Sequence, residues 1–254
     1  GYMLAGGVIA LIGAVGALWI DAATFLISSA IIWSIRYKEN LQGAKQTVKG
    51  VIQDFAEGFR FICASRTIQT VSLIGLLINF GIMPLTVFQT PYVSDYLKMG
   101  PETLSYIKIL TSIGMITGSA LLPKLGKIKT PVIAVAAGVI MGTALIEMSI
   151  AQSLSTPVLK MGILTLSMLS IGFGGGLLNV VIGSSVMKAV PKEMMGRISG
   201  FLTAMMQASM PVASFICSAL AVYFHIPHIL VFFGSLTLIC SLALYFRKKL
   251  DALS

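Results

Sequence analysis

The chain has 254 residues, of which 56% are hydrophobic and only 11% are charged, and its mean hydropathy is +0.93. A soluble domain is roughly 25% charged, so this composition predicts an integral membrane protein. The 18 Lys and Arg against 9 Asp and Glu do not indicate nucleic-acid binding, because the basic residues stand in short hydrophilic stretches between apolar runs.

The apolar runs predict transmembrane helices, since about 20 apolar residues cross a bilayer. The chain begins inside such a run without an initiator Met, so we expect a fragment whose upstream part is missing. A partial helix over 1–12 is joined by a tight "GAVG" turn to the first complete span. The complete spans are predicted at Ala14–Ile35, Ile68–Val93, Leu104–Pro123, Pro131–Ala151, Val158–Met187, Ile198–Phe224 and Ile229–Phe246.

The distribution of basic residues predicts how the spans are oriented. Fifteen of the 18 Lys and Arg fall on one side, in 36–66, in the "KLGKIK" and "KAVPKEMMGR" connections and in the C-terminal tail. Lys98, Lys108 and Lys160 fall on the other side. Because positive residues concentrate in cytoplasmic loops, we expect the linker and the C-terminus to be cytoplasmic in a multi-pass protein of the cell (plasma) membrane.

The stretch 36–66 is long and contains an amphipathic helix. Within "QTVKGVIQDFAEGFRFI" apolar residues recur at spacings of 4, 3, 4 and 3, while charged and amide side chains fill the other face. The apolar positions are Val48, Ile52, Phe55, Phe59 and Ile62. We expect this helix to lie along the inner membrane surface or against the helix bundle. A soluble regulatory helix is the alternative.

Several motifs resemble the second half of a major facilitator superfamily transporter. "GYMLAGG" resembles the end of the antiporter motif in the fifth helix, with Tyr2 where proline is expected. "WIDAATFLISSA" resembles the sixth helix of the macrolide-efflux type of drug–proton antiporter. "DFAEGFRFI" and "AVPKEMMGRISGF" resemble that group's linker helix and its loop between helices ten and eleven. A long cytoplasmic linker followed by six spans is the same layout.

This resemblance covers the whole chain and implies an all-α, polytopic transmembrane bundle, from the end of helix 5 through helix 12 of a twelve-helix fold. The implied parts are 1–35 (end of the N-terminal bundle), 36–66 (linker) and 67–254 (C-terminal six-helix bundle). The resemblance also implies a secondary active transporter that exports small amphipathic compounds by alternating access, driven by protons and without a cofactor. The substrate would bind near the midplane, and the full-length protein would be a monomer.

Three ionisable side chains, Asp21, Lys108 and Glu147, lie within predicted spans. Counted at ~1.5 Å per residue from the cytoplasmic boundary, they lie roughly 22–27 Å into a hydrocarbon core of ~30 Å. They therefore share the outer third of the bilayer. Asp21 also shares a helix face with small and polar residues, a pattern typical of a face that points toward neighbouring helices or a cavity.

Charged groups at membrane depth are costly and usually mark functional sites. Our hypothesis is that Asp21 or Glu147 takes up a proton when the outer gate opens, with Lys108 as a mobile partner, because removing water from a carboxyl favours its protonated form. A fixed ion pair is the alternative, as is snorkelling of Lys108 and Glu147 to the outer headgroups. The sequence leaves these alternatives open.

Residues at mid-depth are the candidates for substrate contacts, since that is where the cavity of such a transporter lies. Amide side chains would supply polar contacts, and aromatic rings would stack on an apolar substrate. The candidates are Asn79, Gln89, Asn179, Gln207, Phe80 and Phe88. Interhelical hydrogen bonding is the alternative for the amides, and plain packing for the aromatic residues.

Glycine spacing predicts that some spans approach closely. Gly114–Gly118, Gly138–Gly142 and Gly172–Gly176 each form a Gly-x-x-x-Gly pair, which lets two helix backbones come together. Such pairs serve either tight static packing or the sliding of helices during alternating access. Pro84 and Pro211 sit mid-span and are expected to kink their helices.

The short basic connections 124–130 and 188–197 carry the charge that orients the spans. In the second of them Glu193 and Arg197 are candidates for an inner gate, a salt bridge that breaks when the cavity opens inward. Charge that serves topology alone is the alternative.

Other classes of function fit the sequence less well. No predicted span contains a histidine, and no His-Glu-x-x-His or Gly-x-Ser-x-Gly motif occurs, so we expect no enzyme and no catalytic residue. The three cysteines and the "HIPH" pair lack the spacing of a metal site. A channel, a non-transporting scaffold or an inactive truncated fragment is the alternative to a transporter. The expected partners are a small-molecule substrate, protons and the lipid bilayer, with no nucleic acid.

Overall fold

The computed structural model describes residues 2–35, 48–100, 102–125 and 128–250, which are helical apart from short connections and include no β-strand. The helices are α1 (Tyr2–Ser34), α2 (Val48–Ala64), α3 (Arg66–Pro91), α4 (Glu102–Leu121), α5 (Thr130–Ala151), α6 (Pro157–Ala189), α7 (Met195–Ala221) and α8 (Ile226–Leu250). Within this described part, seven helices are long and apolar enough to cross a membrane. Their spans differ from the predicted bounds by no more than three residues at either end, which confirms the all-α class.

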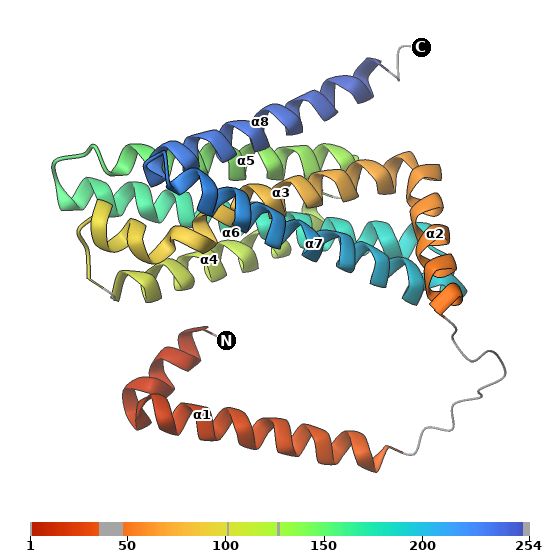
Figure 1. Ribbon diagram of the computed structural model, residues 1–254, viewed down its shortest axis with the longest axis horizontal. Coiled ribbons are helices and arrows are strands. Elements are labelled where there is room, and N and C mark those ends of the chain that lie inside the picture. The colour runs from red at the N-terminus through yellow and green to blue at the C-terminus, as the bar shows by residue number, and fades with distance from the viewer. Residues whose placement is uncertain (1, 36–47, 101, 126–127, 251–254) are drawn as a thin grey trace. The chain divides into compact units, whose positions relative to one another are not determined.

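The chain divides into two compact units, Gly1–Ile52 and Gln53–Ser254. The first unit contains α1, which is broken at Gly13, where φ is 73° and ψ is 171°. This backbone conformation is essentially restricted to glycine. The break confirms the predicted tight turn at the start of "GAVG", and it is the sharp corner of the red ribbon in Figure 1.

The second unit contains the six spans α3 to α8. Helix α6 packs against α4 and α5, and α8 packs against α5 and α3. Helix α7 is held mainly by α3. Helix α6 is continuous over 33 residues, about 50 Å at 1.5 Å per residue, and is therefore longer than a ~30 Å hydrocarbon core.

Glycines bring α4 and α6 into backbone contact. Gly114 and Gly118 of α4 face Gly172 and Gly176 of α6, and a Cβ atom at any of the four would lie 2.1–2.3 Å from a carbonyl oxygen of the facing helix. No side chain fits in such a gap. The close approach predicted from these two glycine pairs is confirmed.

A second close contact joins α5 to α8. A Cβ atom at Gly142 would lie 2.8 Å from the carbonyl oxygen of Gly234, and a Cβ atom at Gly234 would lie 2.8 Å from that of Gly142. At Gly138, a Cβ atom would lie 2.2 Å from the Ser241 hydroxyl. The Gly138–Gly142 pair therefore lies against α8, and the close approach predicted from this pair is confirmed.

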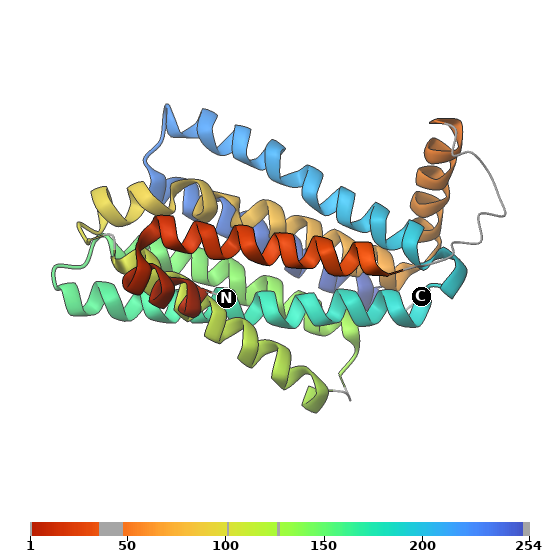
Figure 2. The ribbon, with the colours of Figure 1, turned by 90° about the horizontal axis from the view of Figure 1, so that it is seen from below.

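Helix α2 runs across the ends of the spans of the second unit rather than along them, as both Figure 1 and Figure 2 show. Gly58 and Ile62 are buried, and a Cβ atom at Gly58 would lie 3.2 Å from Cβ of Phe201 in α7. Ile62 joins Ile198 and Leu202 in a small apolar cluster. The part of α2 from Gly58 to Ile62 thus packs against the bundle, while the side chains of Val48, Ile52 and Phe55 lie outside the described ones.

We call this end of the second unit, where Ile62 meets Ile198 and Leu202, the linker end. At the opposite, distal end α3 passes into the π-helical turn η1 (Tyr92–Tyr96). Tyr92 is buried, and its hydroxyl donates a hydrogen bond to the carbonyl of Met148 near the end of α5. The hydroxyl of Tyr96 accepts a hydrogen bond from the Ile226 amide, 3.4 Å away, at the start of α8.

Candidate functional site

Glu147 lies half-buried on α5 with a hydrogen-bond partner on the neighbouring span. The hydroxyl of Ser167, a fully buried residue of α6, donates to Glu147 Oε2 over 3.4 Å. Both residues lie inside helices long enough to cross a membrane. The structure therefore pairs a carboxyl of one membrane-length helix with a hydroxyl of its neighbour.

Lys108 and Asp21, the other two ionisable candidates, occupy different settings. Lys108 is exposed on α4, and its carbonyl accepts a hydrogen bond of 2.8 Å from the Ser112 hydroxyl. Asp21 is exposed on α1, where its carbonyl accepts a hydrogen bond of 2.7 Å from Thr24. Asp21 belongs to the first unit and the other two belong to the second, so the shared charge layer is still a prediction.

The candidates for substrate contacts differ in exposure. Asn179 on α6 and Gln207 on α7 are exposed, whereas Asn79 and Gln89 on α3 are half-buried. The Asn79 amide donates to the carbonyl of Gly75 in its own helix over 3.0 Å.

The two aromatic candidates of α3 lie within the apolar interior. Phe80 stacks on Phe233 of α8 with a centroid distance of 5.2 Å, and Phe88 belongs to the main buried cluster. In this structure both rings pack against protein, and a role in stacking on a substrate is still a prediction.

Arg197 of the predicted inner gate is paired with the linker helix. Its Nη1 atom lies 3.4 Å from Oε2 of Glu57 in α2, and both side chains are about half exposed. Glu193 lies in the short 3₁₀ turn η3 (Lys192–Met194), and its side chain is outside the described ones. The predicted Glu193–Arg197 bridge is therefore untested, and Glu57 is a partner that the sequence did not single out.

Ring packing accompanies this ion pair at the linker end. Phe59 of α2 meets Phe201 of α7 edge to face, with ring centroids 6.3 Å apart. Among the described residues, no three His, Cys, Asp or Glu side chains gather in one place as metal ligands would.

The comparisons with known proteins place the chain in a family. A family model described as Major Facilitator Superfamily matches residues 1–214, from α1 through most of α7. No curated protein and no solved structure matches the chain. Proteins of this superfamily are membrane transporters rather than enzymes, and seven membrane-length helices agree with a multi-pass membrane protein. The chain belongs to the major facilitator superfamily of membrane transporters.

Proposed function

We propose that this chain is part of a proton-coupled exporter of small amphipathic molecules that works by alternating access in the cell membrane. The observation that carries the proposal is the half-buried Glu147 carboxyl, 3.4 Å from the Ser167 hydroxyl within two packed spans. The resemblance of "WIDAATFLISSA" and the linker motif to the macrolide-efflux type supports the direction of transport and the substrate class.

A carboxyl between two spans can couple proton binding to a change in the conformation of the helix bundle. Loss of water around it favours the protonated form, whereas water and a donated hydrogen bond favour the carboxylate. When the bundle alternates between states that hydrate Glu147 to different degrees, the carboxyl binds a proton in one state and releases it in the other. Asp21 is the second proposed carboxyl, and Lys108 is the proposed cationic partner.

The substrate would meet α6 and α7 in this proposal. Asn179 and Gln207 are exposed on these helices and offer the direct polar contacts. Four residues of α3 would form the wall behind them: Asn79, Gln89, Phe80 and Phe88. Export then requires that the linker end face the cytoplasm, which agrees with the excess of basic residues in the connections 124–130 and 188–197.

At the linker end, Arg197 would hold the inner gate closed. Glu193 is the proposed gate partner, and Glu57 is a third member because its carboxylate already lies 3.4 Å from the guanidinium. Both described side chains are half exposed, so the pair is weak enough to exchange partners during a transport cycle.

Proton coupling is tested by comparing transport by the full-length protein with transport by its Glu147→Gln variant. In proteoliposomes with an acidic interior, we expect the unaltered protein to accumulate radiolabelled erythromycin or ethidium and Glu147→Gln to lose this accumulation. Exchange of labelled for unlabelled probe without a pH gradient should persist, because the neutral amide keeps the shape of the side chain. Asp95→Asn is the matched control, since Asp95 is an exposed acid of the distal end.

Three outcomes contradict the proposal. Accumulation by Glu147→Gln at the unaltered rate would remove Glu147 from the coupling mechanism. Flux that does not saturate with substrate would indicate a channel, and no flux of any probe would indicate a scaffold without transport activity.

A further inference from the structure

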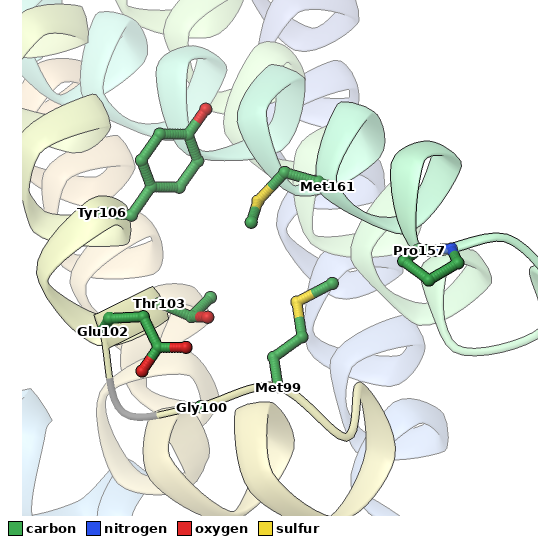
Figure 3. A pocket seen from close by; sticks show the side chains of 7 residues that line it. All are labelled: Met99, Gly100, Glu102, Thr103, Tyr106, Pro157 and Met161. Carbon is green, nitrogen blue, oxygen red and sulfur yellow. The ribbon is translucent and has the colours of Figure 1, made fainter.

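The distal end carries a pocket that the proposed transport cycle does not use. It lies between the start of α4 and the start of α6, with a volume of about 560 Å³, within the range of small-molecule sites. Figure 3 shows the side chains around this open space. The lining residues are Met99, Gly100, Glu102, Thr103, Tyr106, Pro157 and Met161.

The polar groups of the pocket come from one face of α4. Glu102 and Tyr106 are four residues apart, so they lie one helical turn from each other on the same side. Glu102 is exposed, and it is the lining side chain that carries a charge. The Tyr106 hydroxyl shares a hydrogen bond of 2.9 Å with the Thr165 hydroxyl of α6, which fixes the ring at the wall of the pocket.

The opposite wall is apolar and deformable. Met99 and Met161 are half-buried and face the space from the connection after η1 and from α6, beside Pro157 (Figure 3). Thioether side chains adapt to ligands of different shape. A carboxylate and an aromatic ring on one side, with methionines on the other, match a ligand that has one positive charge and an apolar body.

The surroundings make this charge preference depend on Glu102. Helices α4 and α6 both begin at the pocket, and helix N-termini carry partial positive charge that disfavours a cation. Lys98 and Lys160 stand next to lining residues in the sequence, although neither lines the pocket. Among the lining residues, Glu102 supplies the negative charge that opposes this positive background.

We propose that this distal pocket binds organic monocations with an apolar body, such as quaternary ammonium or phosphonium compounds. Glu102 supplies the charge, the Tyr106 ring supplies a cation–π contact, and Met99 and Met161 enclose the apolar part. The binding requires neither Glu147 nor a proton gradient, so it goes beyond the proposed transport mechanism.

Two probes of opposite charge and matched shape test the proposal: tetraphenylphosphonium and tetraphenylborate. Their binding to the purified full-length protein is measured by equilibrium dialysis against protein-free micelles. We expect Glu102→Gln to weaken tetraphenylphosphonium binding about tenfold and to strengthen tetraphenylborate binding, because the positive background is then unopposed. Tyr106→Leu should weaken binding of the phosphonium as well, and Tyr106→Phe, which keeps the ring and loses only its hydrogen bond to Thr165, should weaken it less.

Asp95→Asn is the matched control, because it removes one negative charge from the same end without touching the pocket. Equal losses in Asp95→Asn and Glu102→Gln would overturn the proposal in favour of a general surface field. Phosphonium binding that is absent, or indifferent to Glu102→Gln, would overturn it too. Accumulation of erythromycin under a pH gradient tests Glu147, whereas the opposite responses of the two tetraphenyl probes to Glu102→Gln test the pocket, so a failure of proton coupling and a failure of the pocket give different results.

Discussion

Tyr92 joins α3 to α5 through one buried hydrogen bond. Its hydroxyl donates to the carbonyl of Met148, one of the last four carbonyls of α5. Such carbonyls have no partner within their own helix, and at membrane depth water does not replace the missing donor. The tyrosine hydroxyl therefore satisfies a helix end from a neighbouring span.

We expect Tyr92→Phe to destabilise the second unit by about 0.5–1.5 kcal/mol, the net contribution of a typical hydrogen bond. The ring stays in place, so the change isolates the hydroxyl. The free energy of unfolding in mixed micelles titrated with sodium dodecyl sulfate measures the effect. Tyr223→Phe, at a residue that is 83% exposed, should leave that free energy unchanged, and equal losses in both variants would contradict the assignment.

Single residues also show where sequence patterns stop being informative. The sequence shows that Glu147 places a charge inside a predicted span. It does not show the hydrogen bond to Ser167, because no spacing rule relates residues twenty positions apart on two helices. Arg197 was singled out by its basic connection. Its contact with Glu57 joins residues 140 positions apart and depends on how α2 folds back onto α7. Sequence periodicity places residues on faces, and only packing decides which faces meet.

Among the helices, α4 and α6 are joined by the four glycines that place their backbones in contact. A Cβ atom at Gly172 would lie 2.1 Å from the carbonyl oxygen of Thr111, so one methyl group suffices to push the helices apart. At Gly175, on the same helix, a Cβ atom would meet nothing within 4 Å. Gly172 and Gly175 are therefore the same residue type on the same helix, and they differ only in whether another helix packs against them.

We expect Gly172→Ala to destabilise the bundle by about 1–3 kcal/mol, as overpacking does. Gly175→Ala should be neutral or stabilising by up to about 1 kcal/mol, because alanine favours helix more than glycine does. Unfolding in mixed micelles compares the two variants directly. If both variants were equally stable, the backbone contact between α4 and α6 would not exist in the protein.

Helix α2 is held at the linker end by contacts of unequal strength. The Glu57–Arg197 pair is half exposed and contributes about 0–1 kcal/mol. Phe201 lies over Gly58, where a Cβ atom would lie 3.2 Å from its own, and meets the ring of Phe59 edge to face, so loss of its ring removes apolar contact. We therefore expect Phe201→Ala to speed amide hydrogen exchange in residues 53–64 more than Arg197→Gln does, as measured by mass spectrometry. Faster exchange in Arg197→Gln than in Phe201→Ala would mean that charge, not ring packing, holds α2.

At the scale of the molecule, hydropathy was sufficient to predict the seven membrane-length helices, whereas the orientation that the basic residues indicate is still a prediction. These features follow from the bilayer, which requires long apolar helices whatever they pack against. The docking of α2 was not decided by the sequence, because an apolar stripe fits a membrane surface and a protein surface equally well. In the structure its buried residues Gly58 and Ile62 face protein.

Because residues 53–64 of α2 belong to the same compact unit as α7, we expect α2 to move with the C-terminal bundle during transport. A disulfide between Gly58→Cys and Phe201→Cys should form, since the two Cβ positions are 3.2 Å apart, close to disulfide geometry. In full-length protein with the native cysteines replaced by alanine, we expect the oxidised double variant to retain the transport rate of its reduced form. Loss of transport on oxidation, with recovery on reduction, would show instead that α2 has to undock in each cycle.

Helix α6 is one continuous element whose ends reach both surfaces of the second unit. Met161 near its start lines the distal pocket, and Val186 near its end packs in the apolar cluster beside α2. A rigid rod that pivots about its middle moves its two ends in opposite directions, and the glycine contacts with α4 lie in that middle portion. A ligand that displaces the distal tip would thus shift the support of α2 at the linker end, together with the side chains of α5 that pack along the helix.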